Sequence, residues 1–413
     1  MQIRSMVVFP GQGAQYTGML GRLSGDYDKA EYFVKTASEI SGLDLSELCE
    51  RAGEDELTLT HNAQPALLLS EYIAYRRLTE NYELSPVFFA GHSLGEISAL
   101  TCCGAIDFKD AVNLVTLRGR FMAKAQGGAM AAVQGVSPEQ ILESCEADGR
   151  VVISNYNSPT QIIISGLEEG IEEVLSSLEK LGARTTRLKV SGAFHSPYMK
   201  PAQEQLAPVL DEMNFNYFSA PVISNWDARP YCSPELTADR LKKQLVSSVR
   251  WTDTVQYAVR MGVNTVIEIG PGTVLKNLIL RNEPKLEVYS VDDAHDLERL
   301  QSVLPPRKVK GCDYARIVRR SMGIAVCIKN ENDREADYQK GVIEPYRRLQ
   351  KMKSDMEEGR MEPSPAAARA AVEELKTIIT TKGAGKNILR IRIHQLLREA
   401  GGLEEFSDLL CVN

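Results

Sequence analysis

The segment Gly91-His92-Ser93-Leu94-Gly95 places a serine between two glycines, after a short apolar run and before a helix-like stretch. This context is typical of a nucleophile elbow, in which a sharp turn exposes a serine hydroxyl at the carboxyl end of a sheet. The flanking glycines permit a strained turn, and the Leu94 amide at the helix start would favour a developing oxyanion. The same pattern also fits a glycine-rich turn whose serine only caps the helix.

A serine with an ordinary pKa needs a neighbouring base before it can attack a carbonyl carbon. His195 lies 102 residues after Ser93, in a segment that follows a predicted strand and could face the elbow. The position would equally suit a hydrogen-bonded loop histidine. His92, inside the elbow, is expected to support the turn rather than act as the base. The remaining histidines are interpreted as exposed loop residues or as part of the C-terminal region: His61 and His295, and His394.

The composition is that of an ordinary globular protein. The 413 residues are 43% hydrophobic and 25% charged, and no apolar run is long enough to span a bilayer. The short apolar run Met6–Phe9 predicts a strand, not a signal peptide. Eight cysteines are scattered without metal-ligand spacing, and we interpret them as reduced thiols. The sequence therefore predicts a soluble cytoplasmic protein without a bound metal.

The balance of charge changes along the chain. From Pro305 onward there are 21 lysines and arginines against 16 aspartates and glutamates, whereas the preceding residues contain 27 and 39. The change coincides with the Pro305-Pro306 pair and predicts a domain boundary, with residues 305–413 as an extension of unknown role. Acidic residues are interleaved with the basic ones and no aromatic pattern accompanies them, which argues against nucleic-acid binding.

Residues 1–128 and 191–304 are predicted to form one large subdomain. Strand-like and helix-like stretches alternate there, which favours a mainly parallel sheet covered by helices. The predicted helices span residues 62–82, 95–103 and 107–125, the last with Asp107 as its N-cap, and the predicted strands span residues 6–9, 87–90, 222–225 and 266–269. The turn Gly270-Pro271-Gly272 leads into a further helix.

Residues 129–190 are predicted to form a small subdomain inserted into the large one. Their order of elements, β-α-β-β-α-β, is that of the ferredoxin-like split βαβ arrangement. The predicted strands span residues 130–133, 151–155, 161–165 and 184–190, and the predicted helices span 138–146, capped by Ser137, and 168–181. The turn Asn157-Ser158-Pro159 is expected to join the two middle strands.

The region after Pro305 is predicted to be mostly helical and to contain no catalytic constellation. Residues 333–357 and 366–380 have helical character and are separated by two prolines. Residues 389–393 alternate apolar and basic side chains, which fits either a strand or a short helix face. The pair Ser407-Asp408 is not the Asp-Ser attachment site of a carrier domain.

Six segments together resemble the malonyl-CoA:acyl-carrier-protein transacylases, which are the freestanding acyltransferases of fatty acid synthesis and of some polyketide assembly lines. They are FPGQGAQ at 9–15, GHSLGE at 91–96, RGRFM at 118–122, NYNSP at 155–159, GAFHS at 192–196 and EIGPG at 268–272. The resemblance implies an α/β fold with an α/β-hydrolase-like large subdomain, an inserted ferredoxin-like subdomain and a helical C-terminal extension. It also implies transfer of a malonyl group from malonyl-CoA to the phosphopantetheine thiol of an acyl carrier protein.

The resemblance further implies roles for individual residues. Ser93 corresponds to the nucleophile that carries the malonyl ester in a ping-pong mechanism, and His195 corresponds to its base. Gln244 corresponds to the residue whose backbone carbonyl orients that histidine, so no aspartate is required. Gln12 and Leu94 correspond to the residues whose amides form the oxyanion hole.

The implied acyl pocket contains a cation and an aromatic ring. Arg118 corresponds to the residue that binds the free carboxylate of malonate, a task that suits the planar guanidinium fork, although by itself it could be a solvated helix residue. Phe194 resembles the malonyl-type version of its motif, in which a bulky ring leaves little room for an α-methyl branch. His92, beside the nucleophile, is expected to contact the substrate.

Three alternative functions fit these residues less well. An ordinary esterase would lack the arginine pocket, and an editing acyl hydrolase of the same fold typically lacks an arginine at the position of Arg118. A non-catalytic docking scaffold would not need Ser93, His195, Gln12 and Arg118 together. The chain contains no carrier domain, so the acyl carrier protein and the coenzyme A thioester are its expected partners. We expect a monomer with no permanently bound cofactor and malonyl-CoA as the donor.

Overall fold

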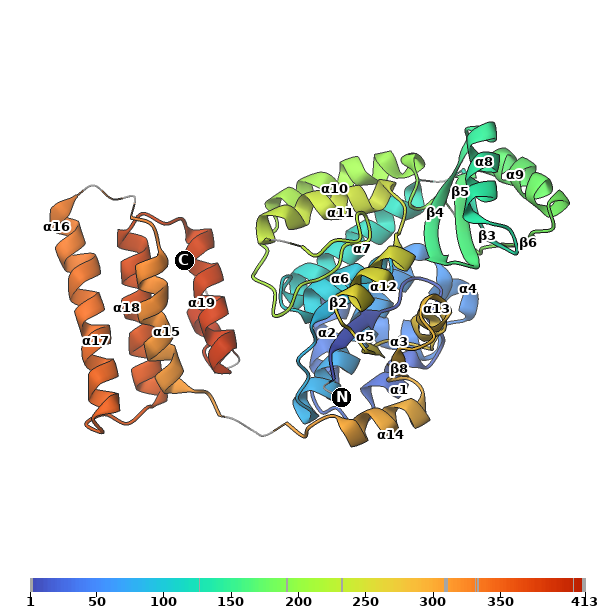
Figure 1. The fold of residues 1–413 in the computed structure, drawn as a ribbon. Helices are drawn as coiled ribbons and strands as arrows, with labels where there is room; N and C mark the ends of the chain where they lie inside the picture. The colour runs from blue at the N-terminus through green and yellow to red at the C-terminus, as the bar shows by residue number, and fades with distance from the viewer. Residues whose placement is uncertain are drawn as a thin grey trace. The chain divides into compact units, whose positions relative to one another are not determined.

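The computed structural model describes residues 3–125, 127–190, 192–231, 233–307, 311–330, 332, 334–403 and 405–410. The chain divides into two compact units, residues 1–307 and residues 308–413. The first contains a parallel sheet and a smaller antiparallel sheet, and the second is helical in its described part. The predicted α/β fold with an inserted small subdomain and a helical C-terminal region is confirmed (Figure 1). Within the described residues, no helix is both long and apolar enough to cross a bilayer.

The large sheet has four parallel strands in the order β2-β1-β7-β8. They are β1 (Ser5–Phe9), β2 (Phe88–Gly91), β7 (Thr265–Glu268) and β8 (Glu287–Ser290). Successive side chains of β1 pack on opposite faces: Val7 and Phe9 belong to one hydrophobic cluster, and Met6 and Val8 belong to another. Parallel strands that are covered on both faces are apolar at every position, which is what the run at 6–9 shows.

Helices of the first unit cover both faces of this sheet. Helices α5, α6 and α7 contribute to the cluster that contains Phe9, and α12 and α13 contribute to the one that contains Met6. The helices are α1 (Met19–Ser24), α2 (Ala30–Ser41), α3 (Leu45–Glu50), α4 (Glu54–Thr58), α5 (Thr60–Asn81), α6 (Leu94–Cys102), α7 (Phe108–Lys124), α10 (Lys200–Glu212), α11 (Thr237–Val246), α12 (Trp251–Arg260), α13 (Val274–Asn282) and α14 (Ala294–Val303), with 3-10 turns at Pro197–Met199 and Pro234–Leu236.

Two predictions for this unit are wrong. The segment 222–225 does not form a regular strand. Instead Val222 makes an isolated parallel bridge to Phe89 of β2, and Ile223 bridges Pro230. His61 and His295 lie in helices α5 and α14 rather than in loops, and only His295 is exposed. Strand β8 and helices α1 to α4, α10 to α12 and α14 were not anticipated.

The small subdomain has four antiparallel strands in the order β4-β5-β3-β6. Its elements are β3 (Gly128–Gln134), α8 (Pro138–Asp148), β4 (Val151–Ser158), β5 (Gln161–Leu167), α9 (Glu168–Lys180) and β6 (Arg184–Arg187). Helices α8 and α9 cover one face through Ile141, Ile171 and Leu178 (Figure 1). Ser137 caps α8 in a capping box with Gln140. The turn between β4 and β5 is shorter than predicted, because the first two residues of the expected turn still belong to β4.

A bulge in β4 changes which face its residues occupy. Ile153 pairs with Ile164, but the next pair is Asn155 with Ile163, so Ser154 is an extra residue in the strand. Side chains alternate along a strand, and one inserted residue therefore inverts the alternation beyond it. Ile153 packs under the helices, whereas Asn155 lies on the opposite face. The bulge also frees backbone groups: the Ser154 carbonyl accepts from the Val249 amide at 2.8 Å.

In the second unit, helices α15, α17, α18 and α19 pack around one hydrophobic cluster. The helices are α15 (Tyr314–Cys327), α16 (Glu335–Tyr338), a π-helical turn (Gln339–Ile343), α17 (Glu344–Glu357), α18 (Pro365–Thr381) and α19 (Lys386–Ala400), followed by a 3-10 turn (Ser407–Leu410). The segment 389–393 is therefore helical and not a strand. Asp333, where a helix was predicted to begin, lies outside the described residues.

Candidate active site

The turn between β2 and α6 holds Ser93 in a strained conformation. Ser93 has φ 54° and ψ −105°, a region that residues with a Cβ rarely adopt. A Cβ on Gly91 would lie 1.9 Å from the carbonyl of Gly95, and a Cβ on Gly95 would lie 2.0 Å from the carbonyl oxygen of Phe9. Both positions therefore require glycine, because the neighbouring backbone is too close for a side chain. This close packing permits the sharp turn at Ser93.

His195 contacts the serine hydroxyl directly. Its Nε2 lies 2.7 Å from Ser93 Oγ, and its Nδ1 lies 3.0 Å from the backbone oxygen of Gln244. Gln244 is in the last turn of α11, where carbonyl groups have no intrahelical partner. The contact to this carbonyl fixes the proton on Nδ1 and leaves Nε2 as the acceptor that faces Ser93 Oγ.

Burial keeps the His195 imidazole neutral. Removal from water, and secondly the positive charge of Arg118, lower the pKa of His195 to about 3. The imidazole is thus unprotonated across the physiological range, so its Nε2 can accept a proton. The backbone of His195 also has a positive φ of 55°. The chain thus holds both members of the Ser93–His195 pair in uncommon conformations.

Arg118 of α7 is buried beside the pair, with 2% of its surface exposed. Its Nη2 lies 3.3 Å from Ser93 Oγ and donates to Gln244 Oε1 at 3.0 Å, and its Nη1 donates to Gln64 Oε1 at 2.8 Å. Its Nε has no acceptor among the described residues. Burial lowers the pKa of Arg118 to about 10, which still leaves the guanidinium charged at neutral pH. The site therefore presents a cation with spare donor capacity next to the serine.

A buried carboxylate supports this arrangement from α6. Glu96 Oε2 accepts from the side chain of Gln244 at 2.9 Å and from the amide of Asn225 at 3.1 Å, and Oε1 accepts from the Tyr231 hydroxyl. Burial raises the pKa of Glu96, and these hydrogen bonds oppose that shift. Asn225 in turn accepts from the Ser93 amide at 2.7 Å and donates to the Gly91 carbonyl at 2.6 Å. Asn225 therefore holds the elbow in place from the segment that follows Val222, the residue that bridges β2.

Sequence reasoning assigned no role to these supporting residues. Gln64, Asn225 and Tyr231 are separated from their partners by 54 to 135 positions, and a single sequence contains no local signal for such contacts. Asn225 ends the segment that was interpreted as a strand, and Glu96 ends the elbow motif. The position of Glu96 in the elbow motif, and that of Asn225 at the end of a predicted strand, are the signals that could have drawn attention to these two residues.

The two predicted amide donors lie in the turn that begins α6 and in the loop that follows β1. Leu94 opens α6, where the first amides lack intrahelical acceptors. Gln12 follows β1 in a loop that touches the elbow, since a Cβ on Gly11 would lie 2.4 Å from the His92 carbonyl oxygen. The Gln12 side chain donates to Thr58 O and Thr60 Oγ1, both at 3.3 Å, which anchors the loop on its other side.

A pocket of about 420 Å³ opens above Ser93 and His195. Its walls come from the loop at Gly11 and Gln12, from α13 and from the sheet face of the small subdomain that the helices leave open. Its lining residues include Met130, Ile163, Asn157, Asn277 and Arg281. His92 also lines the pocket, and its Nε2 lies 2.9 Å from Asn157 Oδ1. Phe194 instead packs in the hydrophobic core beside Met199.

Within the described part of the chain, one cluster has the spacing of a metal site, namely Asp293, His295 and Asp296 at the start of α14. It is separate from the pocket above Ser93. The Asp296 carboxylate is already paired with Lys276 and accepts from the Ser290 amide at 3.0 Å. Asp296 therefore already joins α14 to Lys276 of α13 and to the end of β8, and Asp293 caps α14 by accepting from the Asp296 amide at 2.9 Å.

Comparison with known proteins shows the family to which this chain belongs. Residues 6–297 match the family described as acyl transferase domain, which makes the chain an acyltransferase by fold and site. The malonyl CoA-acyl carrier protein transacylase of Escherichia coli K12 is 41% identical over 281 residues, which are 66% of this chain and 91% of that protein. The chain belongs to the malonyl-CoA:acyl-carrier-protein transacylase family.

Solved structures of similar proteins support the same family assignment. The malonyl-CoA:acyl carrier protein transacylase of Xanthomonas oryzae is 35% identical, with a TM-score of 0.71 over 74% of this chain and 99% of that one. A malonyl transacylase solved in complex with a type II polyketide acyl carrier protein is 39% identical, with a TM-score of 0.69 over 71% of this chain and 98% of that one. The family match ends at residue 297, before the second unit begins.

Proposed function

We propose that this protein transfers a malonyl group from malonyl-CoA to the phosphopantetheine thiol of an acyl carrier protein, through a malonyl ester on Ser93. The observation that carries the proposal is the contact of Ser93 Oγ with two groups at once. A neutral imidazole lies 2.7 Å away and a buried guanidinium lies 3.3 Å away. The first can remove the serine proton, and the second can hold the carboxylate that distinguishes malonyl from neutral acyl groups.

In the first half-reaction, His195 Nε2 accepts the proton of Ser93 as Oγ bonds to the thioester carbonyl carbon. The carbonyl oxygen becomes an oxyanion, which the amides of Gln12 and Leu94 would stabilise. Each such donor contributes on the order of 3 kcal/mol in comparable enzymes. The carbon–sulfur bond then breaks, and the leaving thiolate takes the proton from His195. The products are the malonyl ester and free coenzyme A.

In the second half-reaction, the thiol of the carrier's phosphopantetheine takes the place of coenzyme A. His195 removes the thiol proton, the sulfur attacks the ester carbonyl, and Ser93 Oγ recovers its proton as the ester bond breaks. No step requires a metal or a permanently bound cofactor. Gln244 acts twice in this scheme, through its carbonyl on His195 and through its side chain on Arg118.

Arg118 supplies the selectivity for malonyl groups. Its Nε has no acceptor and its Nη2 points at Ser93, so one edge of the guanidinium can accept a carboxylate in the bidentate geometry that arginine prefers. Phe194 precedes His195 and is buried, so its ring would restrict the space behind the histidine. We place the reaction in the cytoplasm, a location that suits the free cysteines of the described residues.

Mass spectrometry of the intact protein tests the proposal. Incubation with malonyl-CoA and no carrier should add one malonyl group to the wild type and none to Ser93→Ala. Ser302→Ala, on the exposed face of α14, is the matched control and should be labelled like the wild type. Labelling of Ser93→Ala would refute the nucleophile. Steady release of free malonate would favour the editing hydrolase, and no labelling of the wild type would favour the scaffold.

A further inference from the structure

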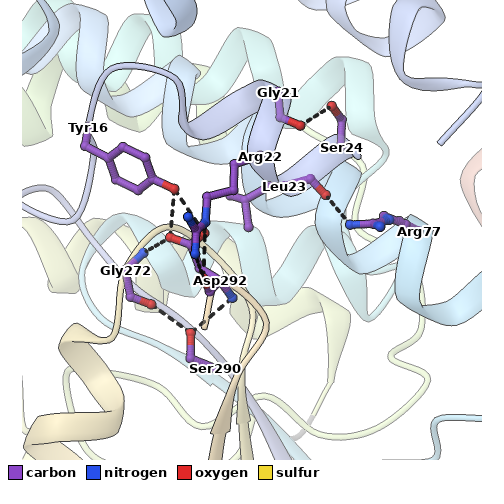
Figure 2. A network of polar contacts seen from close by, with 9 residues as sticks. All are labelled: Tyr16, Gly21, Arg22, Leu23, Ser24, Arg77, Gly272, Ser290 and Asp292. Carbon is purple, nitrogen blue, oxygen red and sulfur yellow. Dashed lines mark hydrogen bonds and ion pairs between the residues drawn. The ribbon is translucent and has the colours of Figure 1, made fainter. Parts of the chain in front are cut away.

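Asp292, which follows β8 outside the pocket, is a buried carboxylate that joins three segments of the first unit (Figure 2). Its two oxygens accept from the Tyr16 hydroxyl at 3.0 and 2.9 Å. Oδ1 also accepts from Arg22 Nε at 2.6 Å, and Oδ2 accepts from the Gly272 amide at 2.6 Å. Three donors thus converge on one side chain, two of them from residues more than 200 positions earlier in the sequence and the third from the segment before α13.

Two of these segments border the active site. Tyr16 belongs to the loop after β1 that carries Gln12. Gly272, with φ 73°, belongs to the turn before α13, the helix whose Asn277 and Arg281 line the pocket. Ser290 strengthens the second attachment, since its Oγ donates to the Gly272 carbonyl at 2.8 Å (Figure 2). Both the amide and the carbonyl of Gly272 are therefore held by the end of β8.

The path from Asp292 to the elbow is short. The Ala14 amide donates to the Gly11 carbonyl at 3.2 Å, and Gly11 packs so closely on the elbow that a Cβ there would lie 2.4 Å from the His92 carbonyl oxygen. Burial and the bond to Asp292 raise the pKa of Tyr16, so its hydroxyl keeps its proton and remains a donor. A shift of Tyr16 would therefore move the loop that places Gln12 next to Ser93.

We propose that Asp292 is a positioning residue that acts through Tyr16 to fix the Gln12 amide relative to Ser93. The inference deepens the proposed function and rests on it, because the Gln12 amide is taken as an oxyanion donor. The oxyanion forms in both half-reactions, so loss of the Asp292–Tyr16 bond should slow both. Binding of malonyl-CoA before the chemical step should change little, because Asp292 does not line the pocket.

Two variants test this bond with different risks to folding. Tyr16→Phe removes only the hydroxyl, and Asp292→Asn keeps the shape but replaces one acceptor oxygen by a donor that faces the amide of Gly272 or the Tyr16 hydroxyl. The rate of acylation by malonyl-CoA can be measured by quenched flow and mass spectrometry at several malonyl-CoA concentrations. In each variant the rate constant should be about tenfold lower than in the wild type, and KM should stay within twofold. The double variant should be no slower than the slower single one.

Arg22→Met is the matched control. Arg22 bonds the same carboxylate from α1, but its side chain is 57% exposed, and among the described residues its side-chain hydrogen bonds go to Asp292 and to neither the Gln12 loop nor Gly272. It should lower the melting temperature at least as much as Tyr16→Phe while leaving the acylation rate unchanged. The inference is overturned if Tyr16→Phe acylates at the wild-type rate, or if Arg22→Met slows acylation equally. If Asp292→Asn does not fold, Tyr16→Phe decides the question. Absence of labelling in the wild type would refute the proposed function instead.

Discussion

The imidazole of His195 is enclosed by protein and lies next to a buried cation. Both conditions favour its neutral form, and they lower its pKa to about 3. We predict that the rate constant for acylation of Ser93 is nearly the same at pH 5.5 and pH 7.5. A histidine with an ordinary pKa near 6.5 would lose about tenfold over that interval. Quenched-flow acylation at the two pH values measures the ratio, and a tenfold fall would contradict the burial argument.

The same shift has a consequence for stability. The unfolded chain exposes His195 with its ordinary pKa, so between about pH 6.5 and pH 3 the unfolded state binds a proton that the folded state does not. This residue therefore lowers the free energy of unfolding as the pH falls through that window. His195→Gln should reduce the acid sensitivity of the first unit, as followed by thermal unfolding at pH 4.5 and pH 7.

In the proposed function, Arg118 binds the malonyl carboxylate, a group that ordinary esterases do not have to bind. In Arg118→Ala a malonyl carboxylate would be buried without a partner, at a cost of about 3–5 kcal/mol, whereas an acetyl group would suffer no such penalty. We expect malonyl transfer to fall at least a hundredfold and acetyl transfer to persist or rise. Competition between malonyl-CoA and acetyl-CoA, scored by the mass added to Ser93, gives the ratio directly. Equal losses for both donors would make Arg118 structural.

At the scale of elements, the turn from β2 into α6 has no room for side chains at its two glycines. A Cβ on Gly91 would meet backbone atoms 1.9 Å away, which no rotamer change can relieve. We predict that Gly91→Ala destabilises the first unit by at least about 3 kcal/mol, or prevents its folding. Gly53→Ala is the control, because nothing lies within 4 Å of its added methyl and its φ is −65°. Thermal unfolding and soluble yield compare the two, and similar behaviour would contradict the steric argument.

The elbow and the small subdomain could be predicted because their signals are local. The glycines around Ser93 mark a close approach, and Ser137 with Gln140 marks a helix start, whatever the rest of the chain does. The supporting contacts of Glu96 and Asn225 could not be predicted, since they join positions more than 125 residues apart. The segment 222–225 has strand composition, yet it makes only isolated bridges because the chain turns back at Ile223 and Pro230.

At the scale of the whole chain, each unit has its own hydrophobic core. The clusters of the first unit contain described residues up to Leu304, and the cluster of the second contains residues from Ile317 to Leu409. Arg307 still bonds to the end of α5, since its amide donates to the Asn81 carbonyl at 2.8 Å, and the Pro305 carbonyl accepts from the amide of Glu83, just after α5, at 2.8 Å. We therefore predict that a chain ending at Arg307 folds and is labelled by malonyl-CoA like the full chain. An insoluble product would contradict this independence.

The second unit carries the excess of positive charge, and we propose that it attracts an acidic carrier. Transfer from malonyl-Ser93 to such a carrier should be several times slower in the chain ending at Arg307 than in the full chain at low salt. The two rates should converge at high ionic strength, because steering by exposed charges is screened over about 10 Å at 0.1 M salt. Equal rates at all salt concentrations would exclude this role. The monomeric state remains a prediction that sedimentation can test.

Because β4 contains an extra residue, the side chains that line the pocket depend on the length of this strand as well as on its residue types. Ser154 inverts the alternation, so Asn155 and Asn157 line the pocket while Tyr156 lies against the helices. Deleting Ser154 would exchange the two sets and replace an amide-lined wall by an aromatic one, without any substitution. The deletion would also remove the carbonyl that holds Val249, and with it a joint between the subdomains. The length of β4 at this position therefore helps to decide which side chains line the pocket.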